Sequence, residues 1–244
     1  MQTSDIILEN NIDNLLNKAS EKFQVDFENV RVGSQTLHVL QITDLDRYID
    51  QLAEESKDRI ELPFWAKIWP ASILLSYYLT SLPEPAADRQ IIELGCGIGL
   101  AGLFCAARGF NVVLSDNNPD ALLFAKINIL KNNLQEKASI MPVDFTLDRL
   151  QQKFDYLVGS EIFYRESGYR GLVKFLLFHL KASPHAEVVL SADYRRQAKK
   201  FFQAAGKEFY IDQKNIGYKE QQQQQPGNEE KFLCAIYRMK AKKK

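Results

Sequence analysis

The first place in this sequence where residue types and spacing suggest chemistry is a glycine-rich segment behind a short apolar run. Gly95, Gly97 and Gly99 stand at alternate positions directly after residues 91–94, and Glu93 lies within that run. Glycine has no Cβ, so a turn built from it leaves backbone N–H groups open to a ligand. The apolar run, the turn and the small residues that follow predict a loop that binds a nucleotide-containing cofactor.

Two cofactors fit this segment. Gly97-Ile-Gly99-Leu-Ala-Gly102 matches the G-x-G-x-x-G fingerprint of dinucleotide-binding folds, and Asp116 follows at about the 20-residue distance that this fingerprint expects. Glu93-Leu-Gly-Cys-Gly-Ile-Gly99 also matches the acidic-x-Gly-x-Gly-x-Gly pattern of S-adenosylmethionine enzymes. The carboxylate of Glu93 would repel a pyrophosphate, but it attracts the ammonium and sulfonium groups of S-adenosylmethionine. The segment therefore favours S-adenosylmethionine, with an NAD-binding oxidoreductase as an alternative.

Acidic residues also stand where predicted strands end. From residue 90 onward, short apolar runs alternate with helical patterns, which predicts a parallel sheet covered by helices on both faces. Ligands of such sheets bind beyond the carboxyl ends of the strands. The acidic residues at these ends are Asp116, Asp144, Glu161 and Asp193. Four carboxylates at one edge of a sheet indicate a site for a cation.

The elements that must position these residues follow from the spacing of apolar side chains. Strands are predicted at residues 91–94, 111–115, 138–143, 154–160, 187–192, 208–212 and 231–239. Helices are predicted at residues 71–81, 99–108, 119–132, 147–152, 169–181 and 195–205. The segment 217–230 is rich in glutamine and lacks apolar anchors, so it predicts a mobile hairpin loop between the last two strands.

Residues 1–61 are predicted to form an N-terminal extension, and residues 62–244 the main domain. The extension holds a helical pattern at 5–20, a pair of short strands within 25–40 and a polar helix at 44–56. None of these elements looks catalytic. We therefore expect the extension to pack on the main domain or to cover part of it.

Both tryptophans of the chain fall just after this extension, in a segment punctuated by prolines. Trp69 directly precedes Pro70, which suits the first turn of a helix. Two interpretations stay open for Trp65 and Trp69. Their rings either pack in the core or close over a flat or cationic part of a ligand.

Composition and motifs exclude several other classes. No apolar run approaches the roughly 20 residues needed to cross a membrane, so no membrane association is expected. The three cysteines lack the spacing of metal ligands and predict reduced thiols in a cytoplasmic protein without a metal. The fourth strand ends in Ser160-Glu-Ile-Phe-Tyr164 and lacks the Asn/Asp-Pro-Pro-aromatic motif that clamps a flipped base, so no nucleic acid is expected as a partner. A monomer is expected.

In these motifs the chain resembles the class I, seven-stranded S-adenosylmethionine-dependent methyltransferases, and more narrowly the protein-lysine methyltransferases of the methyltransferase-16 group. The resemblance runs from about residue 62 to the C-terminus. Its motifs are Phe64-Trp-Ala-Lys-Ile-Trp-Pro70, Glu93-Leu-Gly-Cys-Gly-Ile-Gly-Leu100, Leu114-Ser-Asp-Asn117, Val143-Asp-Phe145 and Val158-Gly-Ser-Glu-Ile-Phe-Tyr164. It implies an α/β fold with a Rossmann-like, mostly parallel sheet of seven strands whose last strand is antiparallel, helices on both faces, and an N-terminal α+β extension. It also implies methyl transfer from S-adenosylmethionine to a lysine side-chain amine of a protein substrate.

The resemblance places ten residues at S-adenosylmethionine: Trp69, Glu93, Gly95, Gly97, Gly99, Asp116, Asn117, Asp144, Phe145 and Ser160. Within this set, the loop from Glu93 to Gly99 would line the methionine part of the cofactor. Asp116 would bind the ribose hydroxyls, because two carboxylate oxygens suit a diol. Asp144 would accept a hydrogen bond from the adenine amino group, with Phe145 against the ring. Trp69 would pack against the cofactor from the N-terminal side.

The same resemblance places the acceptor amine at Glu161 and Tyr164. The family pattern is Asp-x-x-Tyr, whereas this chain has Glu161-Ile-Phe-Tyr164. Glu161 would hold and orient the amine, and Tyr164 would shape the channel for the lysine side chain. The nucleophile must be uncharged and about 3 Å from the methyl carbon. The neighbouring sulfonium charge favours loss of the ammonium proton, and no histidine is assigned as a base.

Two further functions stay open beside the NAD-binding alternative. Related folds with similar caps methylate a small amine or a nitrogen heterocycle, so a small-molecule amine is the main alternative acceptor. The longer side chain of Glu161, where the family has aspartate, also leaves open a catalytically silent protein that binds the cofactor and a partner.

Overall fold

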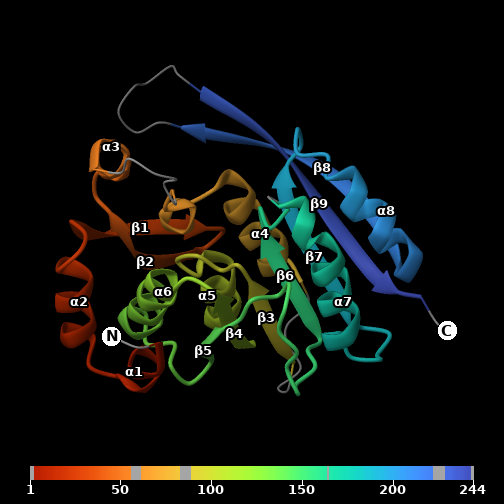
Figure 1. Cartoon of the computed structure of the whole chain (residues 1–244), viewed down its shortest axis with the longest axis horizontal. Coiled ribbons are helices and arrows are strands. Elements are labelled where there is room, and N and C mark those ends of the chain that lie inside the picture. The colour runs from red at the N-terminus through yellow and green to blue at the C-terminus, as the bar shows by residue number, and fades with distance from the viewer. Residues whose placement is uncertain (1–2, 56–61, 83–88, 164, 222–228, 243–244) are drawn as a thin grey trace.

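A seven-stranded sheet forms the centre of the computed structural model, which describes residues 3–55, 62–82, 89–163, 165–221 and 229–242. The strands of this sheet are β3 (Gln90–Leu94), β4 (Asn111–Asp116), β5 (Ala138–Pro142), β6 (Tyr156–Ser160), β7 (Glu187–Asp193), β8 (Phe209–Gln221) and β9 (Glu229–Ala241). Their order is β5-β4-β3-β6-β7-β9-β8 (Figure 1). The first five strands in this order run parallel, and β9 is antiparallel to both β7 and β8. The predicted mostly parallel sheet with an antiparallel last strand is confirmed.

The strand order reverses between β3 and β6. From β3 the chain moves outward to β4 and β5, and then returns to place β6 on the other side of β3. Open α/β sheets bind their ligands at such a reversal, beyond the carboxyl ends of the strands. The glycine-rich segment follows β3 and Glu161 follows β6, so the fold brings both to this place.

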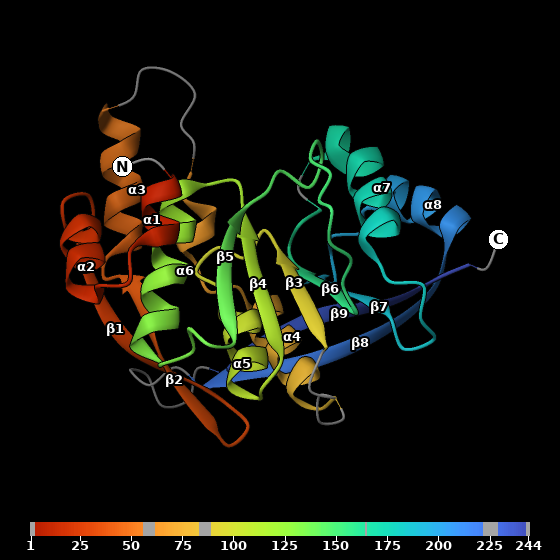
Figure 2. The same ribbon diagram turned by 90° about the horizontal axis from the view of Figure 1, so that it is seen from below.

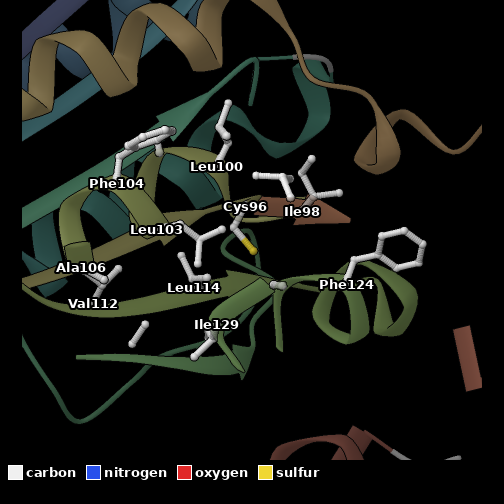
Figure 3. Close-up of a cluster of buried hydrophobic side chains, with 14 of the residues drawn as sticks. Cys96, Ile98, Leu100, Leu103, Phe104, Ala106, Val112, Leu114, Phe124 and Ile129 are labelled. Atoms are coloured by element: carbon white, nitrogen blue, oxygen red, sulfur yellow. The ribbon is translucent and has the colours of Figure 1, made fainter. Parts of the chain in front are cut away.

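Helices cover both faces of the sheet (Figure 2). They are α4 (Pro70–Thr80), α5 (Leu100–Ala107), α6 (Pro119–Lys131), α7 (Tyr169–His179) and α8 (Lys199–Glu208). Side chains of α4, α5 and α6 share one buried cluster, part of which is shown in Figure 3, and side chains of α7 and α8 share another. The strand β3 gives Ile91 to the first cluster and Ile92 to the second, as a strand buried on both faces must. Among the described helices, none combines the length and the apolar character that crossing a bilayer requires.

The N-terminal elements share a core with α6. They are α1 (Thr3–Leu8), α2 (Ile12–Ser20), β1 (Val25–Val32), β2 (Gln35–Ile42) and α3 (Leu45–Glu55). Three of them, α1, α2 and β2, contact α6 directly. The strands β1 and β2 form an antiparallel hairpin of their own, as predicted. Leu15 of α2 and Val39 of β2 are fully buried in the cluster that also holds the side chains of α5 and α6. Lys22 forms an ion pair of 2.8 Å with Asp120 at the start of α6.

The single helix predicted at 5–20 is wrong, because the chain breaks into α1 and α2 at residues 9–11. The carboxylate of Glu9 accepts the backbone N–H of Asn10 (2.9 Å) and of Asn11 (2.8 Å). The side chain of Asn11 then caps α2. These side-chain bonds satisfy backbone groups that a continuous helix would have satisfied itself.

The helix predicted at 147–152 is also wrong, since that segment holds only the end of a turn, at residue 147, and a bend at residue 151. The carbonyl of Asp144 accepts the N–H of both Leu147 and Asp148, and the N–H of Leu150 donates to Nε2 of His179 at 2.8 Å. The helix predicted from residue 195 begins instead at Lys199.

The last two strands are longer than predicted. They pair over residues 209–221 and 229–241, so both ends of the hairpin loop predicted at 217–230 are strand. Residues 222–228 lie outside the described part of the chain. Because β7 pairs with β9 only as far as Cys234, opposite Asp193, the first residues of β9 extend beyond the carboxyl end of β7 (Figure 1).

Candidate active site

The glycine-rich loop after β3 has a backbone that other residues adopt only with strain. Gly95, Gly97 and Gly99 have φ angles of 58°, 54° and 87°, all in the left-handed region. A Cβ on Gly97 would lie 2.5 Å from the carbonyl oxygen of Trp65, so the backbone of the tryptophan segment closes against the loop. The ring of Trp65 packs in the core, with its centroid 5.0 Å from that of Phe124.

Asp116 fixes the loop to the end of β4. Its Oδ2 accepts the N–H of Gly97 at 3.0 Å, and its Oδ1 accepts the N–H of Asn118 at 2.9 Å. Burial raises the pKa of the Asp116 carboxyl, and these two N–H bonds oppose the rise. An ionised carboxylate has about four acceptor positions, so the two bonds leave capacity for a diol.

Glu93 lies beneath the loop. It is 2% exposed, and its Oε2 accepts the N–H of Gly102, in the first turn of α5, at 2.8 Å. Burial raises the pKa of this carboxyl to about 8, and the nearby charge of Asp116 adds to the rise. A Cβ on Gly102 would lie 2.8 Å from this oxygen, which explains the third glycine of the fingerprint. The side chain therefore supports the loop from below and holds the start of α5.

A pocket opens beside the loop, at the carboxyl ends of β4, β5 and β6. Its lining residues are Asn117, Asp144, Phe145, Thr146, Ile162, Arg165, Ser167, Gly168, Tyr169 and Leu172. A Cβ on Gly95 would lie 3.1 Å from Ile162 and 3.7 Å from Phe145, so the loop borders the pocket directly. The volume of about 160 Å³ is below the roughly 300 Å³ that whole drug-sized ligands fill, so the pocket suits one ring system with the rest of the ligand along the loop.

Asp144 is held in a turn at the wall of this pocket. Its Oδ1 accepts both the N–H (2.8 Å) and the hydroxyl (2.5 Å) of Thr146. Thr146 in turn packs closely against the start of α7. A Cβ on Gly171 of that helix would lie 2.3 Å from the carbonyl oxygen of Thr146. Both bonds use Oδ1, and the carboxylate is thus fixed beside Phe145.

Two other predicted residues stand apart from the pocket wall. The hydroxyl of Ser160 is buried without a hydrogen-bond partner among the described residues. Trp69 is half-buried, and its Nε1 donates to the carbonyl of Phe64 at 3.1 Å. Two residues after Trp69, the carbonyl of Ala71 accepts a hydrogen bond of 2.9 Å from the hydroxyl of Ser191. This bond places the start of α4 over β7.

Glu161 begins the segment after β6 with a strained backbone. Its φ of 57° is in the left-handed region, and its N–H donates to the carbonyl of Ser191 at 2.9 Å. Its Oε1 accepts the N–H of Asp193 at 2.6 Å, and its Oε2 lies 2.7 Å from Nε of Arg196. The side chain is only 12% exposed. Tyr164, its predicted partner, lies outside the described residues.

The four acids at the strand ends have different partners and do not form one cluster of unpaired carboxylates. Asp116 and Asp144 border the loop and the pocket, while Glu161 and Asp193 meet arginines. Hydrogen bonds from Arg195 lower the pKa of the Asp193 carboxyl. Arg196 and Thr146 were not predicted as site residues. The Arg195-Arg196 pair, separated from Asp193 by Tyr194, was the one signal in the sequence that cations meet these acids.

These features fit S-adenosylmethionine. A glycine turn at the strand-order reversal borders a ring-sized pocket between Asn117, Phe145 and Ile162, and an acceptor carboxylate, Asp144, stands in its wall. The buried hydroxyl of Ser160 has no hydrogen-bond partner among the described residues, and a bound ligand could supply one. The fold and this site define a class I, S-adenosylmethionine-dependent methyltransferase.

Comparisons with known proteins agree with this class. The fold is similar to that of a putative RNA methyltransferase from Pyrococcus horikoshii (TM-score 0.54, 16% identity, covering 82% of this chain and 98% of that chain). It is also similar to the N-methyltransferase NodS from Bradyrhizobium japonicum, solved with S-adenosyl-L-homocysteine (TM-score 0.53, 15% identity, covering 80% and 98%). At these identities the likeness shows the fold alone.

The chain belongs to the lysine methyltransferase family, whose model matches residues 40–208. It is 28% identical over 171 residues to a calmodulin-lysine N-methyltransferase of Arabidopsis thaliana, covering 67% of this chain and 56% of the relative. It is 32% identical over 146 residues to protein N-lysine methyltransferase METTL21A of Danio rerio, covering 57% and 66%. It is 25% identical over 164 residues to histone-arginine methyltransferase METTL23 of Xenopus laevis, covering 59% and 69%. The match thus spans little more than half the length of the Arabidopsis relative.

Proposed function

We propose that this protein is a protein-lysine N-methyltransferase, which methylates the ε-amine of a lysine in another protein. The observation that carries the proposal is the place of Glu161. Its carboxylate is nearly buried at the end of β6, and the next residue, Ile162, lines the cofactor pocket. A carboxylate so placed can accept a hydrogen bond from an acceptor amine next to the methyl group.

Each part of the site then has a distinct task. S-adenosylmethionine supplies a methyl group on a positively charged sulfur. Asp116, Asp144 and Phe145 would hold the nucleoside part of the cofactor. Glu161 would accept an N–H of the amine and so direct its lone pair. Tyr164, in the role implied by the family resemblance, would form a wall of the lysine channel.

The named relatives support a protein acceptor. Two of the three relatives described above act on lysine by name and one on histone arginine. This distribution favours a nitrogen of a protein side chain over the main alternative, a small amine or nitrogen heterocycle. A lysine-containing protein is the proposed partner, and a cytoplasmic monomer remains a prediction.

The test uses purified protein, methyl-labelled S-adenosylmethionine and an extract of source cells that lack the gene. Asp116→Ala is expected to lose cofactor binding, measured by calorimetry. Glu161→Gln is expected to bind the cofactor normally but to transfer about 100-fold more slowly, because the neutral amide loses the ion pair with Arg196 and one of the two acceptor oxygens. Asp120→Ala, whose carboxylate pairs with Lys22 at the surface, is the matched control.

The position of the label decides between the functions. Label on lysine side chains of one or a few proteins, lost in Asp116→Ala, would support the proposal. Label on arginine or histidine, or only in the small-molecule fraction, would replace lysine by that acceptor. Cofactor binding without label in any fraction would favour the silent binding protein.

A further inference from the structure

The carboxylate of Glu161 is paired with a cation from a different part of the chain. Arg196 lies in the turn between β7 and α8, where its N–H donates to the carbonyl of Asp193 at 2.9 Å. From there its Nε reaches Oε2 of Glu161 at 2.7 Å. The neighbouring Arg195 pairs with Asp193 of the same turn, through Nε at 3.0 Å and Nη2 at 2.8 Å. The two arginines thus divide two acids between them.

The pair leaves Glu161 able to bind an amine. A carboxylate offers about four acceptor positions; the N–H of Asp193 uses one on Oε1, while Oε2, in the ion pair with Arg196, is buried and accepts no hydrogen bond from the described residues. An amine N–H can therefore join without displacing Arg196. The guanidinium stays charged at every pH that the protein survives, so its charge persists when the acceptor arrives.

The charge of Arg196 offsets an unfavourable effect of a carboxylate at the acceptor site. A lone carboxylate beside a lysine favours the ammonium form, which has no lone pair for the methyl group. A fixed cation on the same carboxylate offsets that preference. Glu161 is 12% exposed and Arg196 is 41% exposed, so solvent screens the pair only in part, less than at an open surface.

We propose that Arg196 is a positioning residue that keeps the acceptor amine in its uncharged, nucleophilic form by neutralising Glu161. Glu161 then orients the amine by a hydrogen bond, while the proton that the ammonium loses passes to solvent water. This inference rests on the proposed function.

Within the described residues, the other ionisable groups around Glu161 do not change their ionisation state over the relevant pH range. Burial raises the pKa of the Cys234 thiol to about 11, and the charges of Asp193 and Glu161 add to the rise. Burial, with the charge of Glu161, also raises the pKa of Tyr237. On β7, hydrogen bonds from Arg195 lower the pKa of Asp193, which stays ionised. Glu93 under the cofactor loop has a pKa of about 8 in wild type and variants alike, so the difference between their profiles, and not the profile of one protein, reports the acceptor amine, whose ordinary pKa is about 10.4.

The test is the pH profile of methyl transfer to the labelled protein of the gene-deleted extract. The extract is concentrated until the initial rate no longer depends on its amount, so that the rate follows kcat, which reports groups in the enzyme–substrate complex. Arg196→Gln removes the charge, Arg196→Lys keeps it, and Arg195→Gln removes the neighbouring charge that pairs with Asp193. Cofactor binding by calorimetry shows that each variant is folded. A second readout without turnover is the chemical shift of the Arg196 guanidinium signals in NMR spectra, which is expected to change in Glu161→Gln because the ion pair is lost.

The expected result is a displaced profile for one variant only. In Arg196→Gln the apparent pKa of kcat is expected to rise by about one unit, with a loss of about 10-fold below the wild-type apparent pKa and recovery towards the wild-type rate above it, so the profile is measured on both sides of that pKa. Arg196→Lys and Arg195→Gln are expected to keep the wild-type profile. An equal loss at every pH, or an unchanged profile, in Arg196→Gln would overturn the inference while leaving the proposed function in place. Absence of lysine methylation by the wild-type protein would overturn both.

Discussion

Leu40 of the N-terminal hairpin and Ile98 of the glycine-rich loop are joined through one side chain, that of Asn128. Its Oδ1 accepts the N–H of Leu40 at 2.7 Å, and its Nδ2 donates to the carbonyl of Ile98 at 3.0 Å. Asn128 lies in α6 and is fully buried. The N-terminal hairpin is therefore coupled to the cofactor loop by a hydrogen-bonded path as well as by the shared core.

Asn128→Ala is expected to lower the free energy of unfolding by about 2–3 kcal/mol, because it leaves a buried N–H and a buried carbonyl without partners. It is also expected to weaken binding of S-adenosylmethionine, since the loop loses its support. Urea unfolding and calorimetry measure the two effects. Asn132→Ala is the control, because Asn132 makes the corresponding bonds to His38 at a more exposed place. Equal losses in both variants would contradict a special role for Asn128.

Glu93→Gln is expected to change how stability depends on pH. The carboxyl has a pKa of about 8 when folded, above its ordinary value of 4.5, so the folded state holds a proton that the unfolded state loses. Its contribution to stability is present below about pH 4.5 and is lost as the pH rises to 8, by up to about 1.4 kcal/mol per pH unit. Glutamine cannot ionise, so the melting temperature of the variant relative to wild type is expected to rise across this window and to level off above it. A constant difference would show that Glu93 is ionised in the folded protein.

The sequence predicted those parts of the fold that depend on local patterns. The run at 91–94 and its three glycines specify a strand and a left-handed turn by themselves, because burial on both faces and positive φ angles each demand particular residues. The acids at strand ends were brought to one edge because parallel strands all end there. The helix expected at 147–152 failed because its polar contacts are set by His179, far away in the sequence.

At the site, too, the sequence predicted only the features that depend on local motifs. The pocket wall at Asn117, Asp144 and Phe145 agrees with the residues chosen from motifs. The pairing of Glu161 with Arg196 could not be predicted, because it depends on how the turn after β7 folds back towards β6. The motif placed Glu93 at the cofactor loop but did not show that it lies buried under the loop, where the first turn of α5 donates an N–H to its carboxyl.

Gly95→Ala is expected to affect cofactor binding more than folding. The added Cβ would meet Ile162 at 3.1 Å on the pocket side, and the φ of 58° costs a residue with a side chain about 1–2 kcal/mol. We expect an affinity for S-adenosylmethionine that is about 10-fold lower, measured by calorimetry. Gly206→Ala is the control, because a Cβ there meets open space within α8 and alanine favours a helix. Unchanged affinity in Gly95→Ala would place the cofactor away from this wall.

His179 is expected to make the protein less stable in mild acid. Nε2 accepts the N–H of Leu150 and Nδ1 lies 2.8 Å from the carbonyl of Phe175, so the bonds require a neutral ring with its proton on Nδ1. Burial lowers the pKa of His179, and therefore the unfolded state binds a proton that the folded state excludes. The stability that the neutral ring contributes is present above about pH 6.5 and is lost as the pH falls below that value. Urea unfolding of wild type and His179→Gln at several pH values measures the loss, which is expected to disappear in the variant. His185→Gln, which changes an exposed side chain, is the control and is expected to keep the wild-type dependence of stability on pH. If His179→Gln also kept that dependence, the loss of stability in acid would belong to other groups.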